Sequence, residues 1–517
     1  MDNFDLSAIF ASLPDLGTLA DPAAIEALAP LAPLGVFLLV ALIASIVVRA
    51  RSRARGGTFV NRYFIGNRAL GGFVLAMTTI ATYGSVSSFV GGPGQAWEIG
   101  FGWVYMAVVQ VTALVLLYGI FGKKMALIAR KIDAVTVVDV VRARYGSNLL
   151  ANLSALVIVL FFIATMVAQF VGGAKLFEAV TGYSYTVGLM LFGIAAILFT
   201  VIGGFRGVAV TDTLCGIMML VGIGVLAAGI LEAGGGYEAI MHSLAVKSPE
   251  MLEPFSGGAM PPSLYVSQWL LVGVFTFVLP QSVVRTMGYK DTKSLHRAMI
   301  WGTVIIGAMM IGVTTLGVLA AGVLTEDIAA YGNSVDNIIP TAVVSSLPPV
   351  LAGIAIIGPV AASISTVSSL LISSSSAIIK DLCLQACASR GIAPNERKVA
   401  FWSQLVTLVV GAGVFVLAVV PPDVIWKINM FAFGGLETAF FFVLVCGLFW
   451  KQANSMGALW SLVGGTAAYC VTMALGVRVT DLHQIVIGIG VAGVLMLIGS
   501  LIGKQRKNAR MDVFFPE

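Results

Sequence analysis

Long uninterrupted apolar segments constrain this chain more than any other feature of its sequence. A helix needs about 20 mostly apolar residues to cross the hydrocarbon core of a bilayer. The segments are continuous and do not alternate with a period of two, which favours helices over the strands of a membrane barrel. The sequence therefore predicts an all-α polytopic membrane protein. Its thirteen candidate spans are residues 31–50, 69–97, 100–122, 148–175, 184–204, 209–231, 264–285, 298–323, 349–379, 399–420, 427–450, 456–476 and 484–503.

The composition excludes several other classes of protein. Of the 517 residues, 58% are hydrophobic and only 11% are charged, whereas an ordinary soluble domain has about 25% charged residues. So few charges cannot cover the surface of a soluble enzyme, and so hydrophobic a chain is not intrinsically disordered. The five cysteines show no metal-ligand spacing. We therefore expect small apolar fillers or reduced thiols, and no disulfide framework.

Basic residues indicate how the spans are oriented. With the N-terminus outside, 26 of the 30 Lys and Arg residues fall in inner loops, Arg285 among them. The four exceptions are Lys175, Lys247, Lys427 and Arg478. Membrane proteins retain positive charge on the cytoplasmic side, so this bias predicts an N-out, C-in topology. The net charge of +5 is then a topology signal and implies no nucleic-acid partner.

Two spans carry helix-breaking residues at matching places. Residues 81–94 read ATYGSVSSFVGGPG, and residues 273–285 read GVFTFVLPQSVVR, with Pro280 inside the span. Proline removes a hydrogen bond from a helix interior, and transporters place binding sites where helices are interrupted near the bilayer midplane. An ordinary kink is the alternative interpretation of each break. Because the two spans are five apart, they cross in opposite directions, which predicts two inverted five-helix repeats.

This pattern divides the chain into six expected parts. The first part has five acidic residues and no Lys or Arg, so it lacks the basic region of a signal peptide and is expected to be an extracytoplasmic extension. The parts are the acidic extension 1–29, the first helix and basic cytoplasmic loop 30–68, the first repeat 69–232, an extracytoplasmic loop 233–263, the second repeat 264–450, and the last two helices with a basic cytoplasmic tail 451–517.

The ninth span is rich in hydroxyl groups. Residues 358–380 read GPVAASISTVSSLLISSSSAIIK and contain nine Ser and Thr residues. A hard cation prefers oxygen ligands, which hydroxyls and the carbonyls freed at a helix break can supply without a carboxylate. The alternative is that these hydroxyls bond back to their own helix or join neighbouring helices. Both interpretations remain open from the sequence alone.

Two acidic residues fall inside predicted spans. Asp212 lies in GGFRGVAVTDT and Glu437 in FAFGGLETAFF. Because charge is costly inside a membrane, each is a candidate ion-path group or buried acid, with a structural ion pair as the alternative. Arg206 is close enough along the helix to be the partner of Asp212. Glu437 has no evident basic partner in the sequence.

The chain resembles the sodium:solute symporter family over about residues 56–505. The SSFVGGPG and FGGLE elements are most similar to its pantothenate-transporting branch. The stretches that carry the resemblance are FVNRYFIGNRALGGFVLAMTTIATYGSVSSFVGGPGQAW, GKKMALIARKIDAVTVVD, GGFRGVAVTDT, VRTMGYKDTKSLHRA, FAFGGLETAFF and GLFWKQANSMGAL. The resemblance implies a LeuT-type 5+5 inverted repeat with thirteen transmembrane helices, in a multi-pass protein of the bacterial inner membrane.

The resemblance also implies a sodium site between the break in the second span and the ninth span. Its ligands would be the carbonyl oxygens of Ala81, Gly84 and Ala362 and the hydroxyls of Ser365 and Thr366. Asp212 matches an acidic residue that the family places on the inner sodium path. Na+ is therefore the expected coupling ion, and a single chain is the expected functional unit, with the oligomeric state left open.

The solute pocket is expected beside the same break. The residues proposed for it are Tyr83, Ser87, Ser88, Gln110 and Gln281. Pantothenate has a carboxylate, hydroxyls, an amide and a gem-dimethyl group. Backbone N–H groups at the start of the helix after the break would favour the carboxylate, side-chain amides the hydroxyls, and aromatic rings the methyl groups. The alternatives are another small carboxylate or polar solute.

Other functional classes fit the sequence less well. A channel needs a continuous polar pore or a ring of filter residues, whereas this chain has two interrupted helices. An intramembrane enzyme needs a base beside a nucleophile, yet the histidines His242, His296 and His483 all fall in loops or at loop edges. A non-transporting sensor remains an alternative, although no soluble signalling domain is evident. We therefore expect a secondary active transporter and not an enzyme.

Overall fold

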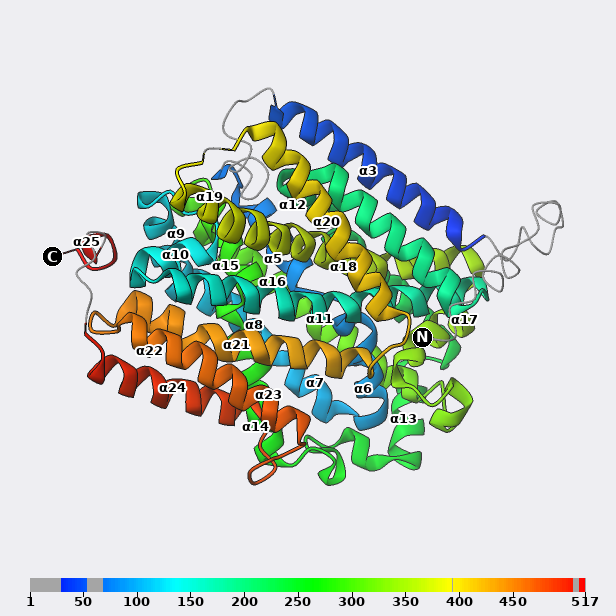
Figure 1. Cartoon of the computed structure of the whole chain (residues 1–517). Helices are drawn as coiled ribbons and strands as arrows, with labels where there is room; N and C mark the ends of the chain where they lie inside the picture. Colours follow the sequence, from blue (N-terminus) through cyan, green and yellow to red (C-terminus); the bar gives the residue numbers. More distant parts are fainter. Residues whose placement is uncertain (1–28, 54–67, 393, 505–510, 517) are drawn as a thin grey trace.

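Long helices that run side by side make up the structure, a computed structural model shown in Figure 1. The structure describes residues 29–53, 68–392, 394–504 and 511–516, without the side chains of residues 49–53 and 202–207. Within these ranges the only strand-like contact is one parallel bridge between Leu70 and Tyr289. The all-α architecture predicted from the apolar segments is therefore confirmed. The expected extension 1–29 lies almost entirely outside the described residues.

The first half of the chain runs as far as the long helix α12. Its elements are α3 (Leu31–Arg53), α5 (Gly72–Tyr83), η3 (Ser87–Gly91), α6 (Gly92–Ile99), α7 (Phe101–Val108), α8 (Gln110–Val115), η4 (Leu116–Phe121), α9 (Gly122–Lys131), α10 (Val137–Tyr145), α11 (Asn148–Thr181) and α12 (Tyr185–Ala233). A capping box formed by Thr136 and Asp139 begins α10, and left-handed Gly146 ends it.

The second half begins with the small helix α13 and ends with α25. Its elements are α13 (Tyr237–Lys247), α14 (Pro262–Trp269), η7 (Leu270–Val274), η8 (Phe275–Val278), α15 (Pro280–Met287), α16 (Thr292–Ala321), η10 (Val335–Asn337), α17 (Ile338–Ser346), α18 (Pro349–Ser376), η11 (Ala377–Leu384), α19 (Gln385–Ser389), α20 (Glu396–Ala418), α21 (Ile425–Phe449), α22 (Ser455–Trp460), η12 (Ser461–Gly465), α23 (Thr466–Ala474), α24 (Ile485–Ile502) and α25 (Met511–Phe514), with short helical turns η5 (Pro249–Leu252), η6 (Ser256–Gly258) and η9 (Ile328–Tyr331).

Every predicted span coincides with a helical stretch. Among the described residues, eleven helices are long and apolar enough to cross a membrane, and the bent pair Gly72–Tyr83 and Ser87–Ile99 is a twelfth candidate. The remaining predicted span corresponds to Tyr185–Val201, a shorter apolar stretch at the start of the 49-residue helix α12. The structure contains no membrane, so the count of thirteen crossings and their orientation stay predictions.

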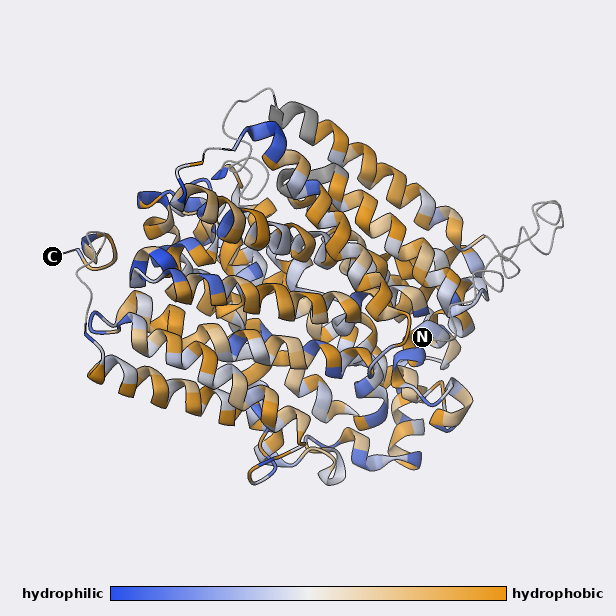
Figure 2. Cartoon of the chain, in the orientation of Figure 1, coloured by the Kyte–Doolittle hydropathy of each residue, from blue (hydrophilic) through white to orange (hydrophobic). Residues whose placement is uncertain are grey.

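Burial separates the central helices from the peripheral ones. In the most apolar window of the span that contains α18, 83% of the residues are buried, compared with 22% in α3. The residues Val36 and Leu39 of α3 are more than half exposed, as expected for side chains that face lipid. Figure 2 shows apolar residues along the middles of the outer helices and hydrophilic residues gathered toward their ends. The central helices α18 and α21 therefore carry the interior that a site can use.

Basic side chains at one end of the bundle hold helix ends together. Arg144, which is buried, donates to the carbonyl oxygens of Gly447 at 2.7 Å, Trp450 at 3.0 Å and Ala453 at 3.1 Å. These carbonyls lie in the last turn of α21 and in the short connection to α22, where the end of a helix leaves acceptors without partners. Basic residues on the predicted inner side thus also satisfy the backbone.

Close helix packing at α12 and α18 generates the first prediction. A Cβ atom on Gly222 would lie 2.7 Å from the Ala355 carbonyl oxygen and 3.1 Å from the Gly358 Cα, whereas one on Gly224 would meet nothing within 4 Å. Gly222→Ala should therefore cost about 1–3 kcal/mol through overpacking and lower the melting temperature of the purified protein in detergent. The matched variant Gly224→Ala should leave that temperature unchanged or raise it. Equal melting temperatures for the two variants would contradict this packing.

Candidate functional site

The break in the second predicted span lies at Gly84. There α5 ends and the chain turns by 66° before η3 and α6 continue. Gly84 has extended backbone angles, with φ −69° and ψ 111°, so the regular helical ladder stops around it. The side-chain oxygen of Gln169 on α11 accepts the freed Val86 N–H at 2.9 Å. Gln169 was not a candidate from the sequence, because nothing local indicates that its buried amide supports another helix.

Hydroxyls of α18 meet the carbonyl oxygens freed at this break. The Ser365 Oγ donates to the carbonyl oxygen of Ala81 at 2.5 Å and to that of Ala362 at 3.3 Å. The Thr366 Oγ1 donates to the Gly84 carbonyl oxygen at 3.4 Å. All five residues of the predicted sodium site are therefore brought together, and all five are buried. Residues 362, 365 and 366 share one face of α18 because they are three and four positions apart.

The predicted break in the seventh span is also present. Leu279 is non-helical, with φ −57° and ψ 122°, and separates η8 from α15, in which Pro280 is the first residue. Proline suits a first helical position because it has no N–H to donate. The helix breaks predicted in both spans are thus confirmed.

A buried ion pair lies between the two broken helices. Arg285 of α15 is 2% exposed, and its guanidinium contacts the carboxylate of Asp212 at 3.5 Å. It also donates to the Thr78 carbonyl oxygen at 3.0 Å and to the Ser369 Oγ at 2.5 Å. Thr78 in turn donates to Asp212 at 2.5 Å. The cluster connects α5, α12, α15 and α18 through charged and polar groups.

Two predictions from the sequence concern the arginines of this cluster. The prediction that Arg285 lies in an inner loop was wrong, because its donors find enough acceptors among four helices to be buried. The side chain of Arg206 lies outside the described residues, so its expected pairing with Asp212 is not described. The signal for Arg285 in the sequence was its place one turn after Pro280 and Gln281, inside an apolar segment.

A small closed cavity lies beside the break in α5. Its volume is about 10 Å³, and it is lined by Tyr83, Ser88, Gln110, Val272, Trp426, Asn429, Met430 and Phe433. Three of the five predicted pocket residues therefore line one cavity, and the Tyr83 hydroxyl donates to the Val272 carbonyl oxygen at 2.5 Å across its wall. Ser87 donates instead to the Ile425 carbonyl oxygen at 3.4 Å, and Gln281 lies outside the lining. The cavity residues that α21 supplies were not predicted from the sequence.

A much larger vestibule of about 1070 Å³ adjoins this cavity. The vestibule and the closed cavity share Trp426 and Met430 in their linings. Trp426 packs edge-on against Trp103, with ring centroids 5.0 Å apart. The vestibule also contains Lys427, one of the few basic residues expected outside. The two side chains Trp426 and Met430 thus separate the vestibule from the closed cavity.

The outer end of α21 is held by a second ion pair. Lys175 contacts Asp336 at 3.3 Å, and the same Asp336 oxygen accepts the Ile425 N–H at 3.0 Å. Asp336 lies in the loop between α16 and α17, and burial raises the pKa of its carboxyl above the ordinary value, while Lys175 and the Ile425 N–H oppose that rise. This contact fixes the start of the helix that supplies Trp426.

Glu437 is the most isolated acid of the described residues. It is fully buried in α21, and within the described part of the chain neither of its carboxyl oxygens has a hydrogen-bond partner. The side-chain oxygen of Asn429, two turns earlier on the same helix, is also buried without a partner.

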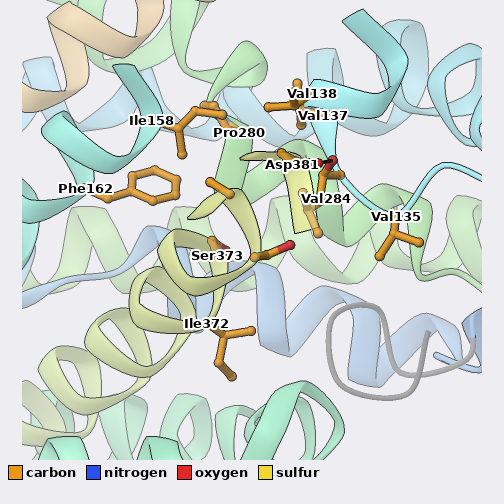
Figure 3. A pocket seen from close by; sticks show the side chains of 13 residues that line it. Val135, Val137, Val138, Ile158, Phe162, Pro280, Val284, Ile372, Ser373 and Asp381 are labelled. Carbon is orange, nitrogen blue, oxygen red and sulfur yellow. Dashed lines mark hydrogen bonds between the residues drawn. The ribbon is translucent and has the colours of Figure 1, made fainter. Parts of the chain in front are cut away.

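A second cavity, of about 30 Å³, lies between α18, α15 and the start of α10 (Figure 3). Val284, Pro280 and Phe162 form much of its apolar wall, and Asp381 lies at its edge. The Asp381 carboxylate accepts a hydrogen bond from Thr136 at 2.8 Å and contacts Lys380 at 3.5 Å. This cavity lies on the same side of α18 as Ser365, toward the end of the bundle that is predicted to be cytoplasmic.

Comparisons with known proteins agree with this geometry. A model of the sodium:solute symporter family matches residues 63–465. The chain is 40% identical to the sodium/pantothenate symporter of Haemophilus influenzae, over 87% of this chain and 92% of that protein. It is 39% identical to the sodium/pantothenate symporter of Escherichia coli, over 91% and 96% of the two chains.

A solved structure has the same arrangement of helices. The substrate-bound, outward-open state of a Na+-coupled sialic acid symporter superposes with a TM-score of 0.79 at 19% identity, and the match covers 93% of this chain and 99% of that chain. The LeuT-type inverted-repeat fold expected from the sequence is therefore the fold of this chain.

The Asp212–Arg285 contact generates the second prediction. Removing one member of a buried ion pair leaves the other charge without compensation and costs about 3–5 kcal/mol. Arg285→Met should therefore destabilise the protein strongly, whereas the double variant Asp212→Asn with Arg285→Met should recover part of that loss. Thermal unfolding in detergent measures both variants. A double variant that is no more stable than Arg285→Met would show that the two groups do not depend on one another.

Proposed function

We propose that this chain, which belongs to the sodium:solute symporter family, imports pantothenate together with sodium across the bacterial inner membrane by alternating access. The proposal rests mainly on one observation. Three carbonyl oxygens and two hydroxyl oxygens come together at a broken helix, beside the closed cavity. Similarity to two sodium/pantothenate symporters over most of their lengths supports the choice of solute. The alternatives are another small carboxylate or polar solute, or a non-transporting sensor.

The oxygens at the break suit a bare sodium ion. Ala81, Gly84 and Ala362 would contribute carbonyl oxygens, and Ser365 and Thr366 would contribute hydroxyl oxygens. The hydroxyls now donate to the Ala81 and Gly84 carbonyls. An ion between them would take over the carbonyl oxygens and turn the hydroxyl hydrogens away. Neutral oxygens from a broken helix are the usual ligands of Na+ at such a place.

The closed cavity suits part of a small polar solute. Tyr83, Ser88 and Gln110 provide hydrogen-bonding groups, while Trp426 and Phe433 provide apolar surface for methyl groups. A cavity of about 10 Å³ has room for roughly one water molecule, so it must widen to admit pantothenate. Ser87 and Gln281 remain proposed contacts that would join the pocket as it widens.

The two proposed sites share one element, which couples them. Tyr83 lies between Ala81 and Gly84 in the chain, so an ion held by those two carbonyls would fix the wall of the solute cavity. Opening at Trp426 and Met430 would connect the cavity to the vestibule. On the inner side we propose that sodium leaves past Asp212, whose charge Arg285 balances while that path is closed. The expected repeats, 69–232 and 264–450, would move relative to one another.

The driving force depends on the number of ions that move with the solute. Each sodium ion gains about 2.3 kcal/mol per 100 mV of membrane potential, and a tenfold sodium gradient adds about 1.4 kcal/mol. Pantothenate is a monoanion, so transport with one sodium ion would move no net charge. Only the chemical gradients would then drive it.

Removing both hydroxyl ligands tests the sodium site. Ser365→Ala combined with Thr366→Ala should raise the sodium concentration for half-maximal uptake by about fivefold or more, because each lost ligand costs about 0.5–1.5 kcal/mol and about 1.4 kcal/mol corresponds to a tenfold change. The measurement is uptake of radiolabelled pantothenate into proteoliposomes, with sodium exchanged for potassium or choline. Ser374→Ala is the matched control, since Ser374 is buried in α18 but has no hydrogen-bond partner. An unchanged sodium dependence would remove the two hydroxyls from the site.

Filling the closed cavity tests the solute pocket. Ser88→Leu should raise the KM for pantothenate by about tenfold or more, since the cavity has no room for three further carbon atoms, and should leave the sodium dependence largely intact. Gln281→Leu should have a smaller effect, because Gln281 lies outside the cavity lining. Uptake competition with other small carboxylates reports the solute. Normal uptake by the Ser88 variant would remove that residue from the pocket, and binding without any uptake would favour the sensor.

A further inference from the structure

Glu437 carries a buried carboxyl group that the proposed transport mechanism does not use. It has no exposed surface, and both carboxyl oxygens lack a hydrogen-bond partner among the residues that the structure describes. A carboxylate without a cation or donors at membrane depth costs several kcal/mol, and a group in that position takes up a proton instead. In the closed arrangement described here, Glu437 is therefore an uncharged acid.

Its place on α21 connects Glu437 to the solute cavity. Residues 429, 433 and 437 are four positions apart and share one face of the helix, and Asn429 and Phe433 line the closed cavity. One turn further along, Phe441 packs against Phe275 and Phe277 of η8, with ring centroids 4.9 Å and 5.9 Å apart. The carboxyl group thus lies between the cavity and an aromatic cluster.

Few ionisable groups surround Glu437. Tyr83 of α5 and Tyr469 of α23 are close enough to interact with it electrostatically, and Tyr83 lines the solute cavity. On the other helices and turns that pack against α21, the described charged side chains lie toward its two ends. At the outer end they are Lys175 and Glu178 of α11, with Asp423 and Lys427 where α21 begins. At the inner end they are Asp139, Arg142 and Arg144 of α10. The other titratable groups are Tyr145 of α10, whose hydroxyl donates to the Val443 carbonyl oxygen at 2.8 Å, and the thiols of Cys446 and Cys470.

The charge balance of the loaded site depends on this acid. One sodium ion and one pantothenate anion sum to zero, so a protonated Glu437 leaves the closed site neutral. An ionised Glu437 would place a second negative charge near the solute carboxylate, in a region where water is excluded and like charges repel strongly. The neutral combination is therefore strongly favoured once the site closes around the anion.

We propose that Glu437 is a proton-binding residue of the solute site, and that binding of an anionic solute takes up a proton there from the outer solution. This inference rests on the proposed function and extends it with a further ligand, the proton. When the vestibule opens and water reaches the cavity, Glu437 can ionise. Solute binding then restores the proton, so affinity for the anion and affinity for the proton rise together, as linkage requires.

Calorimetry of the purified protein tests this linkage directly. Pantothenate binding at saturating sodium is measured in two buffers with different ionisation enthalpies, which gives the number of protons taken up on binding. The range is about pH 6 to about pH 8.5, where the aliphatic carboxyl of pantothenate stays ionised. In the wild type, uptake should rise with pH and approach one proton per pantothenate. The wild-type result alone can overturn the inference, so it does not depend on a variant that folds.

Two variants identify the residue. Glu437→Gln is nearly isosteric and cannot ionise, so its binding should take up no proton, and its affinity for pantothenate should be independent of pH and close to the low-pH affinity of the wild type. The wild-type affinity should fall by up to about tenfold per pH unit once Glu437 ionises in the open state. Glu98→Gln is the matched control, because Glu98 is an exposed carboxylate of α6, and it should behave as the wild type does.

The outcomes separate this inference from the proposed function. Binding of pantothenate without proton uptake at any pH overturns the role of Glu437 alone. The same proton uptake in Glu437→Gln as in the wild type places the proton elsewhere and also overturns it. Absence of pantothenate binding in every buffer, with sodium present, overturns the assigned solute.

Discussion

The broken helix at Gly84 is the constraint on which the rest of the structure depends. Inside a bilayer no water is available to satisfy the carbonyl and amide groups of a broken helix, so other parts of the protein must do so. Gln169 accepts the freed Val86 N–H, and Ser365 and Thr366 donate to carbonyl oxygens of Ala81 and Gly84. The hydroxyl-rich helix α18 must therefore lie at the centre of the bundle, where it is largely buried.

The same hydroxyl–carbonyl contacts provide the basis for function. A hydrogen bond from a serine to a carbonyl can be exchanged for coordination of a cation at little cost, because the same oxygens serve both. One set of atoms thus satisfies the backbone and also provides the oxygens that can bind an ion.

The two buried acids of the interior differ in how their charge can be balanced. Arg285 and Asp212 neutralise one another and are surrounded by Thr78 and Ser369, so this pair can be buried between four helices. Glu437 has no such partner, and only a proton or a mobile cation can neutralise it. The contrast between the two acids follows from their surroundings, since both are buried to the same degree.

Much of the architecture could be predicted from the sequence. Helical spans, their order and the two breaks follow from continuous apolar runs and from Gly84 and Pro280, because these effects act within about 20 residues of chain. The resemblance of short motifs to a known family indicated the five oxygen-bearing residues at the break, which the structure brings together.

The contacts between distant helices could not be predicted in this way. The burial of Arg285, the support from Gln169 and the closure of the cavity by Trp426 and Met430 join residues far apart in the chain. The spacing of polar residues along a helix indicates which of its faces is polar. It does not indicate which other helix packs against that face. The helices and the positions of their breaks follow from the sequence, since both depend on local backbone energetics. The side chains that satisfy the breaks, and the acid that is left alone, emerge only in the folded protein, because those partners are set by how the helices pack.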